Sequence, residues 1–228
     1  MKLSKSKLIF ASIFCVYTAT AHPQMSFQNH EQTLVADSKL VTETEFKNYK
    51  IDQAHTKLMF EVSHLVVSSV SGSFTKFSGT FQFDPNNFEK TTLDAVADIK
   101  SIDTGIQKRD DHLRSPDFFD AKKFPKMLLE STGVKKTGDN TFDLMTTMTM
   151  RDVSKPVVFH VTYKGKVVMM GTEVQAFKAE TKINRQDFGI KFSKIVEAGP
   201  LVGDDVAITI VCEGNPDVVP VKKGKDKN

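Results

Sequence analysis

Apolar residues recur at every second position through much of the sequence, and this two-residue period constrains the fold more than any other feature. Between residues 77 and 83, Phe77, Phe81 and Phe83 share one face of an extended chain, while Ser, Thr and Gln occupy the other. A period of two is typical of a strand with one buried face, whereas a helix places apolar residues three or four positions apart. The sequence therefore predicts a protein built from one-sided β-strands.

Eight segments carry this alternation, and turn residues such as Gly, Pro, Asn and Asp separate them. We expect strands at 57–64, 76–84, 91–100, 126–132, 141–150, 156–164, 172–184 and 204–213. Eight antiparallel strands with a single apolar face hide that face by closing into a barrel, which also leaves no unpaired edge. We therefore predict an all-β fold, an eight-stranded antiparallel barrel with one short helical insertion at 105–119.

The residues that face the barrel interior decide whether it is filled or hollow. A barrel of eight strands is either filled by its own side chains or just wide enough for a slender ligand. Small residues, among them Gly79, Ala95 and Ala97, interrupt the inward-facing Phe residues, so we predict an apolar interior channel. The residues of inward parity expected to line it and to contact a ligand are Phe60, Val62, Phe81, Phe83, Leu93, Leu144, Met148, Phe159, Phe177, Ala179 and Ile183.

One polar residue shares the inward parity. His64 continues the face of Leu58, Phe60 and Val62 to the end of its strand. One interpretation is a histidine whose hydrogen bonds are satisfied at the rim of the barrel. The other is a polar contact to the headgroup of a ligand, and His64 is our candidate residue for that contact.

The first 21 residues differ from the rest of the chain. Three lysines precede a ten-residue apolar run, Leu8 to Tyr17, and Ala19-Thr20-Ala21 follows it. This order is typical of a secretory signal peptide, and the run is too short to cross a bilayer, which needs about 20 apolar residues. We expect cleavage after Ala21, export of the mature chain and no stable insertion in the membrane.

Removal of residues 1–21 changes the charge and the cysteine count. The whole chain has 31 basic and 28 acidic residues, and the segment takes three lysines and no acid with it. The mature chain would then have no net charge, and it would lack the basic surface that nucleic-acid binding needs. Cys15 is also lost, so Cys212 would be the one remaining thiol, and an internal disulfide is excluded.

Composition divides the mature chain into three parts. Residues 22–48 are mostly polar and have no sustained period, which predicts a polar extension. Residues 215–228 contain Pro, several Lys and few apolar residues, which predicts a basic disordered tail. The barrel domain is therefore expected at 49–214.

The residue types that serve in catalysis and metal binding do not form a recognisable pattern. The histidines of the domain lack the spacing that brings two ligands to one metal ion. The run Arg109-Asp110-Asp111-His112 contains acid and base groups, but complementary charges on a surface helix form ion pairs by default. We expect these residues to tie the helical segment to the barrel, and we predict no catalytic residue, no metal and no cofactor.

Three groups of residues resemble the YceI-like family of exported bacterial proteins. The resemblance covers residues 49–213, with Tyr49-x-Ile51-Asp52-x-x-His55 and Phe60-x-Val62-x-His64-Leu65 at its start. The middle group runs from Ile102-Asp103-Thr104-Gly105 through Arg109-Asp110-x-His112-Leu113-Arg114-Ser115 to Phe124-Pro125. The last group comprises Lys155-Pro156-Val157, Arg185-x-Asp187-Phe188-Gly189-Ile190 and Val202-Gly203-Asp204-Asp205-Val206. Asp152 departs from the pattern, because the family usually has Gly in that turn.

The resemblance implies a lipocalin-like barrel in the periplasm that holds a long-chain apolar small molecule. Polyisoprenoids, isoprenoid quinones and fatty amides or acids are the implied ligands, for transport, storage or stress protection. The family has no agreed catalytic residues, so none is carried over. Two alternatives remain open: an interaction or stress protein with a filled barrel and no ligand, and a lipid-acting enzyme with His64 or His112 as base. The oligomeric state also remains open, a dimer included.

Overall fold

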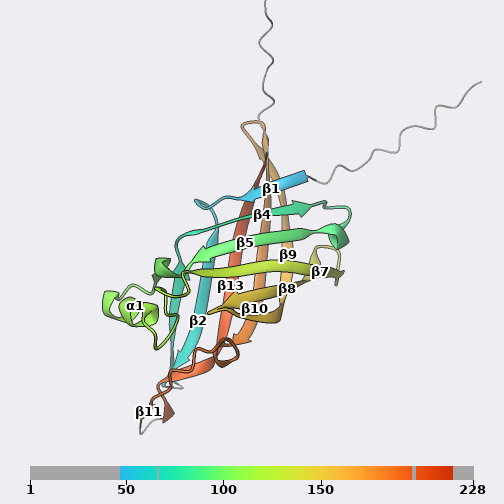
Figure 1. The fold of residues 1–228 in the computed structure, drawn as a ribbon. Helices are drawn as coiled ribbons and strands as arrows, with labels where there is room; N and C mark the ends of the chain where they lie inside the picture. Colours follow the sequence, from blue (N-terminus) through green and yellow to red (C-terminus); the bar gives the residue numbers. More distant parts are fainter. Residues whose placement is uncertain (1–46, 66, 197–198, 218–228) are drawn as a thin grey trace, which may run out of the picture. The chain divides into compact units, whose positions relative to one another are not determined.

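The computed structural model describes residues 47–65, 67–196 and 199–217. The expected signal peptide, most of the expected extension at 22–48 and most of the expected tail at 215–228 lie outside the described residues. The described part is built almost entirely from β-strands (Figure 1). In this part of the chain, no helix is both long and apolar enough to cross a membrane.

The strands follow the chain from the start to the end of the described residues. They are β1 (Lys47–Ile51), β2 (Lys57–His64), β3 (Ser68–Phe74), β4 (Phe77–Phe83), β5 (Thr92–Asp98), β6 (Ile102–Asp103), β7 (Lys126–Lys136), β8 (Thr141–Met150), β9 (Val153–Met169), β10 (Thr172–Asn184), β11 (Ile195–Val196), β12 (Gly199–Pro200) and β13 (Val202–Pro216). The α-helix α1 (Gln107–Arg114) lies between β6 and β7. Short 3₁₀ turns occur at η1 (Phe88–Lys90), η2 (Ile99–Ser101) and η3 (Arg185–Phe188).

Antiparallel pairing closes eight of these strands into a ring. The order around the ring is β1-β4-β5-β7-β8-β9-β10-β13, and β1 pairs with β13 to complete it. The long strand β13 pairs with β1 near its end, where Gly214 faces Ile51, and with β2 earlier, where Ile208 faces Phe60. Strand β3 in turn pairs with β2, while β4 pairs with β1. Each of the pairs β1/β2 and β3/β4 therefore acts as one interrupted strand of the barrel.

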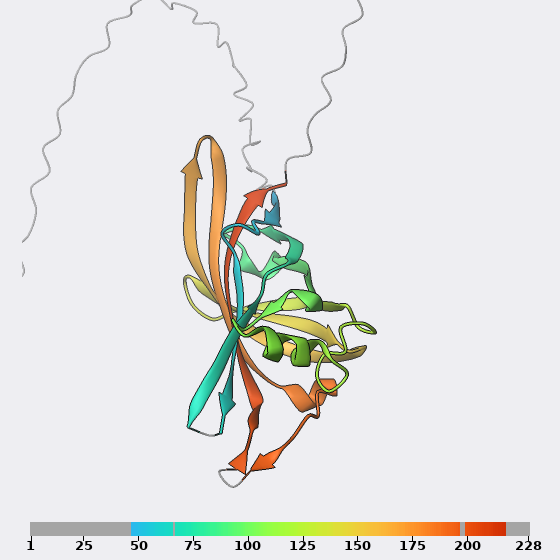
Figure 2. The same cartoon turned by 90° about the vertical axis from the view of Figure 1, so that its left-hand side faces the viewer.

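The eight-stranded antiparallel barrel and the helical insertion predicted from the sequence are confirmed. Each of the eight expected strands has a counterpart, and α1 occupies the middle of the expected helical segment. Strands β1 and β13 extend to Lys47 and Pro216, two residues beyond each expected boundary of the domain, and the Asp217 N–H donates to the Asn48 carbonyl at 2.7 Å. The hairpin of β9 and β10 projects beyond the rest of the barrel (Figure 2).

The turn between β8 and β9 accommodates the departure at Asp152. Arg151 and Asp152 have φ of 51° and 59°, and the flanking Met150 and Val153 face each other across the hairpin. A two-residue loop with both φ positive matches the twist of the flanking strands, and Asp tolerates this backbone better than most residues. The Arg151 guanidinium also donates to the Phe118 and Gly189 carbonyls at 2.6 and 3.0 Å. The turn therefore forms without glycine.

One end of the barrel interior is filled by aromatic rings. We call this cluster the aromatic plug, and it comprises Tyr49, Phe81, Phe83, Phe88, Phe142, Tyr163 and Phe177. Adjacent rings lie close together, with centroids 4.8 Å apart for Phe83 and Phe177. Edge-to-face and offset arrangements at this spacing add to the stabilisation from burial alone. Six of the seven rings are buried and Tyr163 is partly buried, so the plug fills this end of the barrel.

A buried amide satisfies the polar groups of the plug. Gln175 is fully buried, and its amide donates to the Tyr49 hydroxyl at 3.0 Å and to Glu173 at 2.9 Å. The Tyr163 hydroxyl donates to the Gln175 carbonyl oxygen at 2.8 Å. Burial raises the pKa of Tyr49 to about 12, so its hydroxyl stays protonated at neutral pH. Because every member has a partner, the network fixes the strands around the plug.

Candidate functional site: an apolar cavity at one end of the barrel

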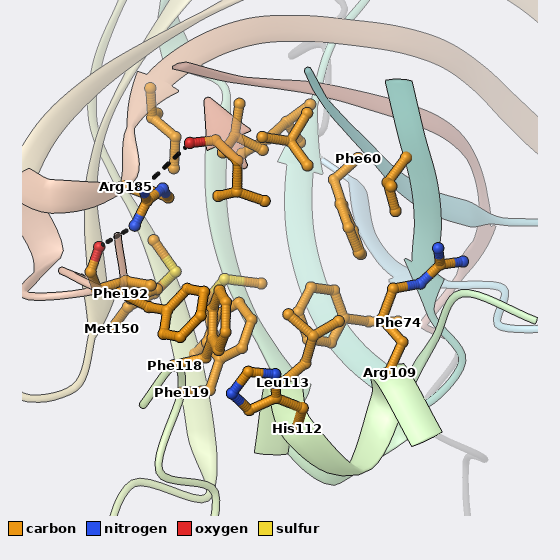
Figure 3. Close-up of a pocket in the computed structure, with 18 of the residues that line it drawn as sticks. Phe60, Phe74, Arg109, His112, Leu113, Phe118, Phe119, Met150, Arg185 and Phe192 are labelled. Atoms are coloured by element: carbon orange, nitrogen blue, oxygen red, sulfur yellow. Dashed lines mark hydrogen bonds between the residues drawn. The ribbon is translucent and has the colours of Figure 1, made fainter. Parts of the chain in front are cut away.

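The other end of the barrel holds a cavity of about 260 Å³ (Figure 3). Strands β2, β3, β10 and β13 form its walls together with α1 and the segments that follow α1 and η3. The lining is mostly apolar and includes Leu58, Phe60, Val62, Val70, Phe74, Leu113, Phe118, Phe119, Met127, Met150, Ile183, Ile190, Phe192, Val206 and Ile208. A concave site lined by apolar side chains is the usual form of a pocket for an apolar molecule.

Strand alternation and register place these side chains together. On β2 the residues Leu58, Phe60 and Val62 share one face, because successive side chains of a strand point to opposite sides. Phe60 faces Ile208 and Val62 faces Val206 across the β2–β13 pair. The apolar faces of the two strands therefore coincide and form one wall of the cavity.

Strand β3 forms a wall of the cavity only because Gly72 allows it to lie close to Phe60 of β2. A Cβ atom at Gly72 would lie 2.6 Å from the Phe60 ring and 2.8 Å from the Asp103 carbonyl oxygen. Real Cβ atoms do not approach other atoms so closely, so glycine is required for this packing. Val70 and Phe74 flank Gly72 and line the cavity.

Arg109 and Arg185 both line the cavity, and Arg185 is engaged with protein atoms. Arg185 is 5% exposed and donates to the Gly203 carbonyl at 2.8 Å, the Ile190 carbonyl at 2.7 Å and the Asp204 carboxylate at 2.8 Å. Burial lowers the pKa of the Arg185 guanidinium, and the Asp204 carboxylate opposes that shift. Because its donors are used and its charge is paired, Arg185 holds the loop after η3 against β13.

Helix α1 is tied to the barrel beside the cavity by polar contacts. The buried Asp110 carboxylate accepts from the Thr104 N–H at 2.9 Å and the Thr104 hydroxyl at 2.6 Å, and Arg109 donates to the Thr104 carbonyl at 2.8 Å. Arg114 donates to the Lys100 and Ile102 carbonyls at 2.9 and 2.6 Å. Asp111 bonds within the helix, to Gln107 and Arg114. Arg109 and Asp110 therefore hold the helix to the turn before it, and Arg114 joins the helix to η2 and β6, a part that was expected of Arg109, Asp110 and Asp111.

Histidine and aromatic residues stand at the mouth of the cavity. The His112 ring lies edge-on to Phe118 and Phe192, with centroids 5.0 Å from each. His112 Nε2 is 2.9 Å from the Asp117 carboxylate, and the side chain remains 45% exposed. His64 also lines the cavity and is half-buried. Besides Arg185, the polar groups of the lining are these two imidazoles and the Arg109 guanidinium.

The residues predicted to line a channel are divided between the cavity and the packed core. Phe60, Val62, Ile183 and His64 line the cavity. The other eight belong to the core or pack against it: Phe81, Phe83, Leu93, Leu144, Met148, Phe159, Phe177 and Ala179. All face inward, but packed side chains of the core surround the second group. The part that each residue takes in binding a ligand stays a prediction.

Several cavity residues were not predicted from the sequence. Val70 and Phe74 lie on β3, whose sequence SSVSGSF shows little apolar alternation. Leu113, Phe118 and Phe119 follow one another in and after α1, where the charged run was the feature considered. The apolar residues between those charges were the available signal, because a surface helix with no apolar contacts has no reason to carry them.

One group of side chains outside the cavity could hold a metal ion. The ligand atoms of Asp52, His55 and Glu213 all lie within 4.8 Å of one another. The spacing of residues along the chain did not predict this group, because Glu213 is distant from the other two residues. The Asp52 carboxylate already has partners within the protein. It accepts from the Ala54 N–H at 2.9 Å and from the Asn215 side chain at 3.2 Å, and it lies 2.8 Å from the His55 ring. The group therefore joins the turn after β1 to β13.

Cys212, the cysteine of the described residues, lies close to this group and is unreactive by its surroundings. Cys212 packs against the core, and burial raises the pKa of its thiol to about 11. A thiolate is the reactive form of cysteine, so a thiol with a raised pKa is a poor nucleophile at neutral pH.

Fold and cavity together define a class of protein: a lipocalin-like β-barrel with an apolar pocket at one end. The family model of the YceI-like domain matches residues 49–214, and the chain belongs to this family. Protein YceI of Escherichia coli O157:H7 is 36% identical over 174 residues, which cover 73% of this chain and 86% of the relative.

Solved structures agree with this assignment. The YceI protein of Campylobacter jejuni is 32% identical with a TM-score of 0.61, over 68% of this chain and 90% of that structure. A polyisoprenoid binding domain from Saccharophagus degradans, implicated in plant cell wall breakdown, has a TM-score of 0.58 over 74% of this chain and 98% of that domain. Its sequence is 14% identical, so that likeness concerns the fold alone.

Proposed function

We propose that this protein binds the apolar chain of a lipid-like molecule in the cavity and does so without catalysing a reaction. The observation that carries the proposal is an apolar cavity of about 260 Å³ beside an interior that is otherwise packed with rings. Protein interiors are normally close-packed, so unfilled apolar space has a use or a cost. A bound chain gains about 0.8 kcal/mol for each methylene removed from water, before ordering costs are subtracted.

The ligand is a polyisoprenoid, an isoprenoid quinone, or a fatty amide or acid. Support comes from the family and from the polyisoprenoid binding domain of Saccharophagus degradans. His64 and His112 stand where the headgroup would emerge. Such a protein transports or stores its ligand or protects it under stress.

The proposed location is the periplasm, and it depends on cleavage of residues 1–21. The intact mass of the protein recovered from cells should correspond to a chain that begins at His22. A retained N-terminus, or a lipid attached to Cys15, would contradict this location.

A second candidate is an interaction protein that needs no ligand. The aromatic plug favours it, because one end of the barrel is already filled by side chains. This candidate gives no account of the cavity at the other end.

Extraction of the purified protein with organic solvent, followed by mass spectrometry, tests the two against each other. An apolar compound in about one-to-one ratio with the protein supports binding, and added prenyl or fatty chains should be taken up. Val62→Trp should abolish uptake because the side chain enters the cavity, while Val211→Trp, at an exposed position of β13, should leave it unchanged. No extracted compound together with no uptake by the unaltered protein would favour the second candidate.

A further inference from the structure

We propose that the cavity selects amphiphiles with an anionic head, a carboxylate or a phosphate, and that Arg109 binds this head while the apolar chain lies in the barrel. The choice of head rests on the proposed function, because it concerns the same cavity. It divides the proposed ligands into two groups, since fatty acids and prenyl phosphates carry an anionic head, whereas quinones and fatty amides do not.

The polar side chains that line the cavity are all basic. They are Arg109, Arg185, His64 and His112, and no acidic side chain is among the described residues of the lining. Such a lining offers hydrogen-bond donors to a ligand, because a guanidinium has no acceptor and an imidazole N–H donates. Positive groups that converge on one space favour an anion there.

Carboxylates of the protein already pair with two of these basic side chains. The Arg185 guanidinium lies 2.8 Å from the Asp204 carboxylate, and His112 Nε2 lies 2.9 Å from the Asp117 carboxylate. Arg109 forms no ion pair with a carboxylate in the part of the chain that the structure describes. Since an arginine is charged at every physiological pH, Arg109 presents a permanent charge that a bound anion can pair with.

Arg109 uses one edge of its guanidinium to bond to Thr104. Its Nε donates to the Thr104 hydroxyl at 2.7 Å, and its Nη2 donates to the Thr104 carbonyl at 2.8 Å. The Thr104 hydroxyl in turn donates to the buried Asp110 carboxylate at 2.6 Å. Asp110 therefore fixes the guanidinium through the threonine and does not pair with it directly.

The other edge of the Arg109 guanidinium is open to a ligand. It comprises Nη1 and the second N–H of Nη2, and it has no hydrogen-bond partner among the described residues. Two N–H groups on one edge match two oxygens of a carboxylate or a phosphate. Because Thr104 already holds the guanidinium in place, less side-chain freedom is lost when an anion binds.

Helix α1 places Arg109 at the edge of the cavity. Arg109, His112 and Leu113 are three and four residues apart, so they share one face of the helix, and all three line the cavity. Figure 3 shows Arg109 at one edge of the cavity and Arg185 at the opposite edge. Arg109 is half-buried, and the His112 side chain is 45% exposed. A head bound here would therefore remain in contact with water.

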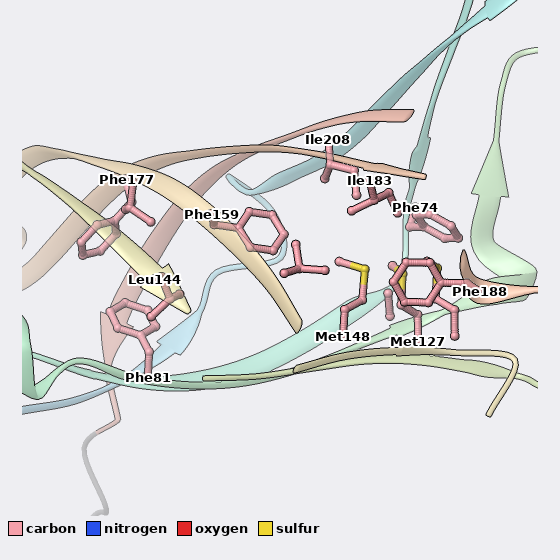
Figure 4. Packing of buried hydrophobic residues seen from close by; sticks show 14 of the residues in the cluster. Phe74, Phe81, Met127, Leu144, Met148, Phe159, Phe177, Ile183, Phe188 and Ile208 are labelled. Atoms are coloured by element: carbon pink, nitrogen blue, oxygen red, sulfur yellow. The ribbon is translucent and has the colours of Figure 1, made fainter. Parts of the chain in front are cut away.

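The packed part of the barrel interior offers no site for an anion. Figure 4 shows buried side chains of the core, and those that it labels are all apolar. In the aromatic plug the hydroxyls of Tyr49 and Tyr163 bond to Gln175, so these polar groups are already used. Burial of a charge without partners costs free energy. The head therefore stays at Arg109, and the apolar chain extends into the barrel.

Four compounds that share one saturated chain and differ in the head test this choice: a carboxylate, a phosphate monoester, a primary amide and an alcohol. Their affinities are measured by displacement of a neutral fluorescent apolar probe from the purified protein. The carboxylate and the phosphate should bind about tenfold more tightly than the amide and the alcohol, because hydrogen bonds between charged groups are stronger.

The outcomes separate the choice of head from the proposed function. The tighter of the two acids identifies the class of head, and either order supports the proposal. Equal affinities for all four heads would overturn the choice of head while supporting the proposed function. No binding of any of the four compounds would overturn both.

Arg109→Gln locates the head. The glutamine amide can still donate to Thr104, but the charge is lost, so affinity for the carboxylate should fall about tenfold while affinity for the amide stays unchanged. Lys108→Gln is the matched control, because it removes the same charge from the neighbouring exposed position, which does not line the cavity. It should keep the preference for the acid. A preference that survives in Arg109→Gln, or that Lys108→Gln loses to the same extent, would refute the role of Arg109.

A crystal structure decides the matter where Arg109→Gln does not fold. The unaltered protein is crystallised with the phosphate monoester, whose head gives strong electron density. The phosphate oxygens should lie within about 3 Å of Nη1 and Nη2 of Arg109. A phosphate that lies away from Arg109 would overturn the assignment.

Discussion

A pair of small-to-large substitutions separates the filled part of the barrel from the open part. Ala179 packs against the core and faces Val161 on β9 and Ile210 on β13. Ala179→Phe must displace packed side chains, and such overpacking costs about 1–3 kcal/mol. Val206 lines the cavity, so Val206→Phe places its added bulk in open space and should change stability by less than about 1 kcal/mol.

Urea unfolding followed by circular dichroism measures both effects, because the chain has no Trp to report fluorescence. For a domain of this size a cost of about 2 kcal/mol corresponds to a fall of about 4–8 °C in melting temperature. The effects on binding should be the reverse of the effects on stability. Val206→Phe should no longer bind apolar chains, whereas Ala179→Phe should still bind them where it folds. Equal destabilisation by both substitutions would refute the division of the interior into a filled and an open part.

Arg185→Leu should lower the free energy of unfolding by about 3 kcal/mol, because two backbone carbonyls lose a charged donor. Asp204→Asn, at a side chain that is 46% exposed, should lower it by less than about 1 kcal/mol. Similar urea midpoints for the two variants would contradict this difference. His55→Gln should lower the melting temperature most in mildly acidic solution. Asp52, with Glu213 nearby, raises the pKa of His55. The stabilisation that protonated His55 provides is therefore lost as the pH rises through the raised pKa. His55 lowers the pKa of Asp52. The stabilisation that the ionised Asp52 carboxylate provides is therefore lost as the pH falls through the lowered pKa. Melting curves that differ equally at all pH values would contradict the pairing.

The strands that alternate cleanly were predictable, and those that do not were missed for physical reasons. Over residues 141–150 the inward positions are apolar except for Thr146, burial alternates without a break, and β8 has those bounds. Strand β3 consists mostly of Ser and Gly, so its pairing with β2 rather than its own apolar pattern makes it a strand. Strand β1 has five residues, of which Lys47, Asn48 and Lys50 are polar, and it forms because β4 and β13 pair with it on either side.

The division of the interior was beyond reach from the sequence because it depends on register. Parity correctly predicted that Phe81, Phe177 and Phe60 face inward. Whether rings from different strands meet at one level of the barrel depends on how far each strand is shifted against its neighbour. In the structure the register brings Phe81 and Phe177 together and leaves Phe60 opposite Ile208. One end is consequently filled, and the other retains a cavity.

Crystals of the protein grown with an apolar chain that carries a terminal bromine test the central claim most directly. Anomalous scattering locates the bromine independently of the rest of the ligand. The peak should lie within the cavity, among Phe60, Phe74 and Ile208. A peak on the outer surface of the barrel, or within the aromatic plug, would contradict the assignment of this cavity as the binding site.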